Sequence, residues 1–338
     1  MTGPLRIGVI GAGLIATRAH LPAYAACEDA RVVAIASGRV DRARETAAQF
    51  GVPRIHERWQ DLIADPAVDA VDICAPNHLH AEMAVAAARA GKHVLVEKPM
   101  ALSLAEADAM IEAAGATGVT LMVAHNLRFV PVYRQVKRVI ADGEIGRPLA
   151  ARGVFMHAGP DEFWGAESDW FWDERAGGGS LLDMGVHMID LMRWFFDEPV
   201  IEVMAMTSRI LRPTPFDDNA IVLMRFAGGA IASVQSSWSA RPEPDRQVTV
   251  HGEKGYVAMG RTPAEPLYAK VKEGDSVRHY VPDAPLPGLD QNPIAHFVRC
   301  VLSRETPLTS GKEGRRTLAV TLAAYQSARS GQSVKLDG

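Results

Sequence analysis

Two segments of the chain carry side chains whose types and spacing suit acid–base chemistry. The first is residues 94–99, Val-Leu-Val-Glu-Lys-Pro, an apolar run that ends at Lys98 and Pro99. Open α/β folds bind their ligands at the carboxyl edge of the sheet, so a strand that ends here places an ammonium group at that edge. Proline disfavours helix at the preceding residue and permits a cis peptide bond, so we expect the Lys98 side chain to be held in one direction.

The second segment is residues 177–190, Gly-Gly-Gly-Ser-Leu-Leu-Asp-Met-Gly-Val-His-Met-Ile-Asp. Asp183 and His187 are four residues apart, so a helix places them on one face, and Asp190 continues roughly that side. Alcohol oxidation needs a group that takes the hydroxyl proton as hydride leaves carbon, and the pKa of histidine lies nearest neutrality. The triple glycine predicts a backbone that folds closely over a ligand. The alternative is a buried His187 that satisfies a carbonyl and an Asp183 that caps the helix.

A metal centre at these residues is a weaker hypothesis. His187, Asp183 and His157 are possible zinc ligands, but an aspartate and a histidine four residues apart supply only two ligands. We therefore expect no metal ion.

A glycine-rich turn near the N-terminus predicts a dinucleotide cofactor. Residues 11–16, Gly-Ala-Gly-Leu-Ile-Ala, follow an apolar run and precede a helical stretch. Gly11 permits the tight turn, Gly13 lets the backbone approach a pyrophosphate, and Ala16 allows close packing of helix on sheet, while Leu14 and Ile15 complete the loop. The alternative is a glycine turn in another kind of α/β protein.

The end of the second predicted strand favours NADP over NAD. An NAD site commonly has an acidic residue about 20 residues after the glycines, which holds the ribose 2′-hydroxyl. Here Ser37 and Arg39, with Arg42, instead offer a hydroxyl and guanidinium groups to a 2′-phosphate. The alternative is that Arg39 is a solvated residue at the start of the next helix and that the cofactor is NAD.

A third loop is expected at the same edge of the sheet. Residues 75–80, Ala-Pro-Asn-His-Leu-His, open another helix. We expect Pro76, Asn77 and His80 to line the nicotinamide half of the cofactor, with Asn77 as an ordinary N-cap as the alternative.

The elements that must position these residues alternate between strands and helices in the first third of the chain. This alternation, with continuous apolar strands, predicts a parallel sheet covered on both faces. The expected strands are Arg6–Ile10, Val32–Ser37, Ala70–Ala75, His93–Glu97 and Thr120–Val123, and the expected helices are Ala16–Ala26, Arg42–Phe50, His80–Ala90 and Ser103–Gly115.

The second half of the chain has the pattern of a mainly antiparallel sheet. From Leu149 onward the strands lengthen and alternate, and Gly228-Gly229 joins two of them as a hairpin turn. Helices are expected near Leu181–Phe196 and Pro293–Ser303. The fold class is therefore α/β, with a dinucleotide-binding domain at 1–124 and a second domain at 125–338.

Composition excludes several classes of protein. A chain of 338 residues is too long for one ordinary core. A net charge of −4 argues against a nucleic-acid partner, and no apolar run is long enough to span a membrane. No signal peptide precedes the first strand, and the three cysteines are widely spaced, so we expect a cytoplasmic protein without disulfides.

Five segments together resemble one family over essentially the whole chain. GAGLIA, APNHLH, GKHVLVEKPMALS, AHNLRFVP and GGGSLLDMGVHMID are similar, in this order, to the glucose–fructose oxidoreductase, inositol dehydrogenase and rhizopine-catabolism (Gfo/Idh/MocA) oxidoreductases. The resemblance implies a Rossmann domain and a second α/β domain with a large, open, mostly antiparallel sheet. In relatives that sheet often forms the face for dimers or tetramers, so a homodimer or homotetramer is expected.

The resemblance also implies roles for individual residues. Lys98, Asp183 and His187 match the catalytic set, Glu97 matches a residue that bonds the nicotinamide ribose, and Asn126 is expected at the cofactor. The implied reaction transfers hydride between NAD(P) and a hydroxyl or carbonyl carbon of a sugar, sugar derivative or cyclitol. In it His187 moves the hydroxyl proton, Asp183 orients the substrate, and Lys98 stabilises the developing alkoxide.

The residues that bind substrate are less well defined by the sequence. Aromatic side chains between Asp161 and Trp172, including Trp164, lie beside acids and suit stacking on a sugar ring. They suit equally well the anchoring of a loop to the core. Arg128 is expected either to reach the substrate or to hold the junction between domains.

Two other functions are compatible with the same architecture. An NAD-dependent glycosidase cleaves glycosides by transient oxidation, without net change of the cofactor. A non-catalytic sensor binds NADP(H) and turns nothing over, although the presence of Lys98, Asp183 and His187 argues against it.

Overall fold

The computed structural model describes residues 3–165, 169–212, 214–262, 265–271, 277–280, 290 and 292–337. The chain forms two compact units. Unit 1 consists of Met1–Asn126 and Asp290–Arg316, and unit 2 consists of Leu127–Leu289 and Thr317–Gly338.

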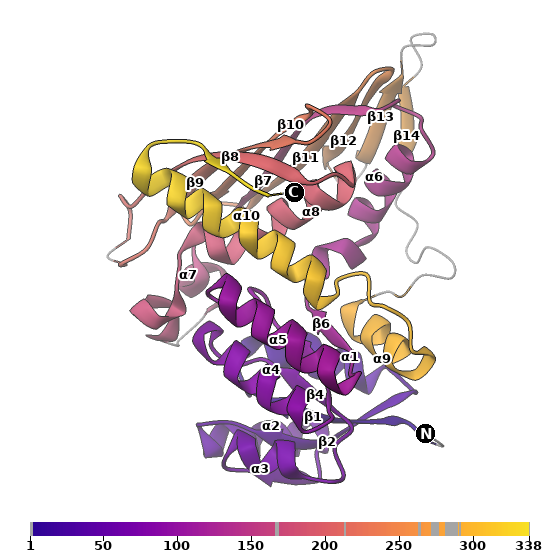
Figure 1. Ribbon diagram of the computed structural model, residues 1–338, viewed down its shortest axis with the longest axis vertical. Coiled ribbons are helices and arrows are strands. Elements are labelled where there is room, and N and C mark those ends of the chain that lie inside the picture. Colours follow the sequence, from indigo (N-terminus) through magenta and orange to yellow (C-terminus); the bar gives the residue numbers. More distant parts are fainter. Residues whose placement is uncertain are drawn as a thin grey trace. The chain divides into compact units, whose positions relative to one another are not determined.

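Unit 1 contains a six-stranded parallel sheet of the Rossmann type (Figure 1). Its strand order is β3-β2-β1-β4-β5-β6. Strands β2 and β3 are therefore added on one side of β1 and strands β4 to β6 on the other, which places the topological switch point between β1 and β4. All of β4 and most of β1 and β5 are buried, which explains their continuous apolar sequences. The strands are β1 (Leu5–Ile10), β2 (Ala30–Ala36), β3 (Arg54–His56), β4 (Ala70–Ile73), β5 (His93–Val96) and β6 (Leu121–Val123).

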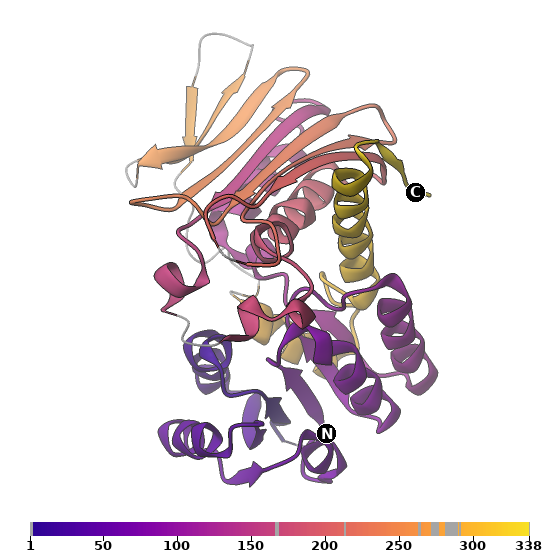
Figure 2. The same ribbon diagram turned by 90° about the vertical axis from the view of Figure 1, so that its left-hand side faces the viewer.

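The helices of unit 1 lie on both sides of this sheet (Figure 2). The stretch after the glycine turn begins as a π-helical turn, η1, and continues as a short α-helix. A capping box between Ser103 and Glu106 sets the start of α5. The helical segments are η1 (Ala16–His20), α1 (Leu21–Ala25), α2 (Val40–Phe50), α3 (Trp59–Ala64), η2 (Asn77–Leu79), α4 (His80–Arg89), α5 (Leu104–Thr117), η3 (Asn126–Phe129, at the boundary with unit 2) and α9 (Pro293–Ser303).

The predicted domain boundary between residues 124 and 125 lies two residues before the observed one, after Asn126. A single boundary is not enough, however, because Asp290–Arg316 also belongs to unit 1. The segment returns to the edge of the sheet at β6. There the Val123 N–H donates to Thr309 O at 2.8 Å, and Thr309 Oγ1 donates to Val123 O at 2.7 Å. Arg315 pairs with Asp108 of α5, with Nη2 2.9 Å from Oδ2. The division between the units therefore falls inside the long helix α10 (Gly311–Ser330).

Unit 2 is built on a nine-stranded sheet in the order β14-β13-β12-β11-β7-β10-β9-β8-β15. Neighbouring strands are antiparallel except β7 and β10, which are parallel, so the expected mostly antiparallel sheet is confirmed. The strands are β7 (Pro148–Met156), β8 (Val200–Ser208), β9 (Asn219–Phe226), β10 (Ile231–Ser237), β11 (Asp245–Gly252), β12 (Gly255–Thr262), β13 (Glu265–Val271), β14 (Val277–Tyr280) and β15 (Val334–Lys335).

The described helices of unit 2 lie on one face of this sheet, and none of them covers the other face, called the bare face below (Figure 2). α6 (Pro131–Ala141), α8 (Val186–Phe196) and the later turns of α10 bury apolar side chains against the sheet. The core includes Phe195, Phe226 and Trp238, all nearly inaccessible to solvent. The remaining helical segments are α7 (Pro160–Trp164), η4 (Asp169–Trp172), η5 (Glu174–Ala176) and the π-helical turn η6 (Leu181–Gly185). Among the described residues, no helix is both long and apolar enough to cross a membrane.

Candidate functional site

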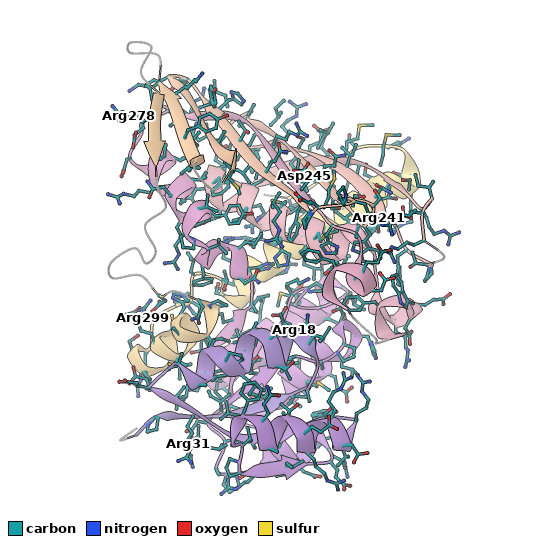
Figure 3. All side chains as sticks on the ribbon, turned by 180° about the vertical axis from the view of Figure 1, so that it is seen from behind. Arg18, Arg31, Arg241, Asp245, Arg278 and Arg299 are labelled. Carbon is teal, nitrogen blue, oxygen red and sulfur yellow. The ribbon has the colours of Figure 1, made fainter. Side chains whose placement is uncertain are left out.

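The carboxyl edge of the sheet in unit 1 gathers the residues predicted to bind a cofactor. Arg31 lies at the amino end of β2, whereas Arg18 follows the glycine turn, so these two residues mark opposite edges of the sheet (Figure 3). The loops after β1, β4 and β5 are neighbours because these strands are adjacent. This is the edge at which open α/β folds bind ligands.

The two glycines of the turn after β1 have different physical roles. Gly11 has a φ of +108°, and a Cβ atom added there would lie 2.3 Å from the carbonyl oxygen of Cys74. At Gly13 an added Cβ would have no atom of the chain within 4 Å. Gly11 is therefore required by the fold itself, whereas space beside Gly13 is left for a ligand.

We expect Gly13→Ala to weaken cofactor binding and to leave the stability of the protein unchanged. The added methyl group meets no protein atom but occupies the space that a pyrophosphate would approach. The dissociation constant of the dinucleotide, followed by tryptophan fluorescence, should rise about tenfold or more. The control, Gly11→Ala, should lower Tm instead, because strain and a backbone clash cost on the order of 1–3 kcal/mol. Unchanged cofactor affinity in Gly13→Ala would contradict this assignment.

The end of β2 presents the residues expected at a 2′-phosphate. Ser37 is half-buried and its Oγ accepts a hydrogen bond from the backbone N–H of Arg39 at 3.3 Å. Arg39 is exposed and forms the N-cap position of α2 without a side-chain capping bond, and Arg42 follows in the first turn. Within the described part of the chain, neither guanidinium makes a hydrogen bond or ion pair that would hold it away from a ligand.

The loop after β4 corrects two expectations. Asn77 is the first residue of η2 and not an N-cap, because Pro76 occupies that position. The His80 ring is fully buried, with Nδ1 2.8 Å from the carbonyl oxygen of Pro99 and Nε2 2.8 Å from that of Ala75. Both ring nitrogens thus face carbonyl oxygens of the protein, and the neutral ring, whose pKa is lowered by burial, donates to one of them. His80 joins the loops after β4 and β5 and is not a cofactor ligand.

Glu97 and Lys98 follow β5 at the same edge. The Lys98–Pro99 peptide is cis, and the Lys98 side chain is half-buried. Glu97 is 8% exposed, and its Oε2 accepts a hydrogen bond from the Lys98 N–H at 3.0 Å. Its Oε1 lies 3.0 Å from Nε2 of His20, a residue of η1. At the next strand, Asn126 is exposed just beyond β6, which places it at the same edge.

In unit 2, Asp183 occupies the π-helical turn η6 and His187 lies in the first turn of α8. The Asp183 side chain is 18% exposed, and its Oδ2 accepts a hydrogen bond from Trp238 Nε1 at 3.3 Å. The same oxygen lies 3.9 Å from Nε2 of His157. Because His157 Nδ1 accepts the N–H of Gly159 at 2.9 Å, the ring proton is on Nε2 and faces the carboxylate.

Gly185, between the aspartate and the histidine, has a packing role. A Cβ atom there would lie 2.7 Å from Leu181 Cδ1 and 3.1 Å from Ser236 Oγ of β10. The helix therefore approaches the sheet closely, which leaves His187 only 8% exposed beside the ring of Phe155, at a centroid distance of 6.0 Å.

The triple glycine does not have the expected role of folding over a ligand. An added Cβ at Gly179 would lie 1.8 Å from the carbonyl oxygen of Asp217, and one at Gly178 would lie 2.7 Å from Tyr325 Oη. The Asp217 carboxylate accepts bonds from the Leu181 N–H and Ser180 Oγ at 2.8 Å and from Tyr325 Oη at 2.8 Å. Because the glycines have no Cβ, Asp217 can approach closely, and its carboxylate bonds the start of η6.

The partners of Asp190 and Arg128 argue against the first of the two expectations for Arg128, contact with the substrate. The two residues form a buried bidentate ion pair, with Nε–Oδ2 and Nη2–Oδ1 distances of 2.7 Å. Thr317 Oγ1 donates to Asp190 at 3.0 Å. Arg128 is 2% exposed, so its guanidinium is committed to this pair and is excluded from the substrate-binding residues. Asp190 is likewise buried and committed to this pair.

The aromatic segment before the glycines is only partly described. Trp172 is half-buried and packs edge to face on Trp238, the partner of Asp183, with ring centroids 5.8 Å apart. The Arg212 guanidinium lies 5.8 Å from the centre of the Trp172 ring and pairs with Asp161. The side chain of Trp164 lies outside the described residues. Trp172 therefore remains a predicted substrate-binding residue.

Sequence reasoning missed several residues that are far in the sequence from the predicted site residues but contact them or their neighbours in the structure. The sequence offered only weak signals for them. His20 follows the glycine turn by seven residues, and Asp72 is a charged residue inside an apolar strand. His157 was considered only as a zinc ligand, and Trp238 and Asp217 were not singled out.

Comparisons with known proteins agree with this architecture. A family model described as "Oxidoreductase family, NAD-binding Rossmann fold" matches residues 5–125, and one described as "GFO/IDH/MocA C-terminal domain" matches residues 133–258. The chain is 32% identical to myo-inositol 2-dehydrogenase of Thermotoga maritima over 344 residues, covering 98% of this chain and 99% of that protein. It is 32% identical to 1,5-anhydro-D-fructose reductase of Ensifer adhaerens, covering 98% of each. A solved structure of levoglucosan dehydrogenase in complex with NADH and L-sorbose is similar, with a TM-score of 0.88 and 29% sequence identity, covering 99% of this chain and 100% of that one.

Proposed function

Because the chain belongs to the GFO/IDH/MocA oxidoreductase family, we propose that it transfers hydride between a nicotinamide cofactor and a hydroxyl-bearing carbon of a sugar, sugar derivative or cyclitol. The observation that carries the proposal is the placement of a half-buried Asp183 and a nearly buried His187 four residues apart in η6 and α8, in a chain whose parallel sheet presents Lys98 at its ligand-binding edge. The substrate class is supported by the names of the relatives, which act on inositol, anhydrofructose and levoglucosan.

The residues of unit 1 fit a dinucleotide. The open space at Gly13 and the turn Gly11–Ile15 suit the pyrophosphate, and Pro76, Asn77, Glu97 and Asn126 lie at the edge proposed for the nicotinamide half. The bound cofactor supplies the hydride acceptor in oxidation and the donor in reduction. Ser37, Arg39 and Arg42 would contact the adenosine ribose.

The side chains of the protein manage the proton and the charge. His187 takes the hydroxyl proton in oxidation and returns it in reduction. Asp183, held by Trp238 and His157, accepts a hydrogen bond from a substrate hydroxyl and orients it. The Lys98 ammonium stabilises the negative charge that develops on the reacting oxygen.

The first experiment is a panel of sugars and polyols with NAD and NADP, scored by nicotinamide absorbance. Absence of turnover across the panel would contradict the proposal.

The proposed cofactor preference is NADP. The two arginines that follow β2 supply positive charge where an acidic residue would favour NAD. The family binds NAD(H), so the proposed preference is a higher kcat/KM with NADP than with NAD and not an exclusion of NAD.

We expect Arg39→Ala to lower kcat/KM for the NADP form about 10- to 100-fold while leaving the NAD form nearly unchanged. One charge-assisted hydrogen bond to the 2′-phosphate accounts for this difference. The matched control is Arg31→Ala, because Arg31 is exposed at the amino end of β2, the strand that Arg39 follows, and so lies at the opposite edge of the sheet (Figure 3). A wild-type enzyme that prefers NAD would contradict the proposed preference.

The bare face of the sheet in unit 2 is proposed to pair with a second copy of the chain as a homodimer or homotetramer. It carries a continuous apolar patch, in which Met204 of β8 pairs with Leu223 of β9 and Met206 pairs with Ile221. Met206 is 76% exposed and Leu223 is 52% exposed. Monomeric proteins rarely expose a contiguous apolar patch of this kind.

The double variant Met206→Asp/Leu223→Asp should therefore sediment as a monomer, whereas the wild type sediments as a larger species. Ile55→Asp, an exposed apolar position in unit 1, is the control and should leave the mass unchanged. A wild-type monomer would overturn the proposed assembly.

The three cysteines are free, which fits a reducing compartment, and we propose a cytoplasmic location.

A further inference from the structure

A buried histidine links the cofactor-binding helix to the segment that carries Lys98. His20 is the last residue of η1 and is 3% exposed. Its Nδ1 lies 2.8 Å from Oδ2 of Asp72, and its Nε2 lies 3.0 Å from Oε1 of Glu97. Asp72 is fully buried in β4, and Glu97 is nearly so. One imidazole ring therefore bridges two buried carboxyl groups from neighbouring strands.

The geometry and the surrounding charges point to one ionisation state of this cluster. An ionised carboxylate only accepts hydrogen bonds, so a ring that serves two of them donates from both nitrogens and is an imidazolium. Burial acts to lower the pKa of His20, but the charge of Asp72 and its hydrogen bond raise that pKa well above its ordinary value. Burial acts to raise the pKa of Glu97, but the hydrogen bond and charge of His20, with Lys98, hold it below its ordinary value.

The cluster extends to the catalytic segment through Glu97. While Oε1 faces His20, Oε2 accepts the Lys98 N–H at 3.0 Å, so the carboxylate fixes the backbone from which the lysine side chain projects. At its other end, η1 starts directly after the glycine turn. Cys74 Sγ lies 3.4 Å from His20 Nδ1, and its pKa, raised by burial and by Asp72 to about 12, keeps it a neutral thiol.

We propose that His20 is a positioning residue of the hydride-transfer reaction, whose imidazolium keeps Glu97 ionised and oriented so that Glu97 in turn holds Lys98. This inference rests on the proposed function, because it concerns the orientation of the proposed catalytic lysine. Both ring nitrogens of His20 are engaged by carboxylates, so the group formed by His20, Asp72 and Cys74 is better described as an ion network than as a metal site.

Removal of the imidazolium has a defined electrostatic consequence. In the described part of the chain, the ionisable groups around the Glu97 and Asp72 carboxylates are His20 of η1, Tyr24 of α1, Cys74, His80 of α4 and Lys98. Without His20, the Asp72 and Glu97 carboxylates share a buried site with less positive charge. Two carboxylates in such a site cannot both stay ionised at low cost, so Glu97, which loses the hydrogen bond and charge of His20, takes up a proton at a higher pH.

The activity test uses His20→Gln on the full chain with its cofactor. Because loss of His20 removes a hydrogen bond and a charge that lower the pKa of Glu97, that pKa rises, and kcat should gain an acidic limb that falls about tenfold per pH unit below the new pKa and recovers at high pH. The double variant His20→Gln/Asp72→Asn removes the second carboxylate and should shift this limb back toward low pH. A merely structural role for His20 predicts a uniform loss at all pH values and no rescue.

His296→Gln is the matched control. His296 is also buried in unit 1, but Asp290, the carboxylate that it meets in the described part of the chain, is paired with Arg299 as well. This variant should leave the shape of the pH profile unchanged. A wild-type pH profile in His20→Gln, with activity retained, would overturn the proposal.

A second measurement does not depend on activity or on any variant folding. In the cofactor-free full chain with ¹⁵N-labelled histidine, the His20 ring, assigned by NMR, should stay protonated on both nitrogens well above the ordinary histidine pKa of about 6.5. Titration of His20 near that value would overturn the proposal. Because this spectrum needs no substrate, it decides the state of His20 even if the sugar panel shows no turnover and the proposed function fails.

Discussion

Replacing His187 by asparagine is expected to lower kcat by about 10²- to 10⁴-fold, the range typical of a positioned acid–base group. Asparagine retains a polar side chain of similar reach but cannot take up the hydroxyl proton. The effect should fall mainly on kcat, with a small change in KM, because the proton moves in the transition state and not on binding. Steady-state kinetics on the best substrate of the panel measure the ratio.

The control for this variant is His251→Asn, an exposed histidine on β11 of the same unit, which should behave as wild type. Thermal unfolding must accompany the kinetics, because His187 is nearly buried and its loss lowers stability as well. A folded His187→Asn enzyme with near-wild-type kcat would show that another group moves the proton.

The second large effect is expected for Lys98→Met, which removes the ammonium group and keeps an unbranched side chain. Loss of one charge that stabilises a developing oxyanion costs about 10²- to 10³-fold in kcat. Cofactor affinity should stay close to the wild-type value if the ammonium acts on the reacting oxygen. Stopped-flow measurement of reduced nicotinamide, together with a separate cofactor titration, distinguishes these two effects.

Lys312→Met tests whether the loss of any lysine charge in unit 1 produces the same result. Lys312 is exposed in the first turn of α10 and should be neutral to substitution. If Lys98→Met weakened cofactor binding by the full factor and left kcat unchanged, Lys98 would be a cofactor-binding residue only.

The parts of the fold that could be predicted from sequence are those with strong local signals. The apolar runs that became β1, β4 and β5 are buried almost throughout, and their periodicity differs plainly from that of the helices between them. The glycine turn was recognisable because Gly11 needs a positive φ, which few other residues tolerate. The Gly228-Gly229 hairpin between β9 and β10 is confirmed for a similar local reason.

What the sequence could not supply are contacts between residues far apart in the chain. The carboxylate of Glu97 meets His20 from 77 positions earlier, and Asp217 clamps Gly179 and Leu181 across 38 and 36 positions. Glycines in sequence show that space is needed but not whether ligand or protein fills it. At Gly179 the neighbour is the backbone of Asp217, which is why the expected ligand contact was wrong there.

The long helix α10 and the return of residues 290–316 to unit 1 were missed for a related reason. The α10 sequence mixes small, polar and apolar residues, and its buried side includes Thr317 and Thr321 beside Leu318 and Ala324, so no clear apolar stripe marks it. The return of the preceding segment depends on pairing of Thr309 with Val123, a partner 186 positions earlier.

Transfer of deuterium from substrate to cofactor is the most direct test of the central proposal that this enzyme moves hydride from a carbon of a sugar or cyclitol to nicotinamide. A perdeuterated polyol or sugar from the panel is incubated with the enzyme and oxidised cofactor, and the mass of the reduced nicotinamide is measured. The proposal predicts that each reduced cofactor carries one deuterium from the substrate, and that Lys98→Met and His187→Asn slow its appearance. Cofactor that binds but gains no deuterium would contradict the proposal and favour a sensor, and glycoside cleavage with no net reduced cofactor would contradict it and favour a glycosidase.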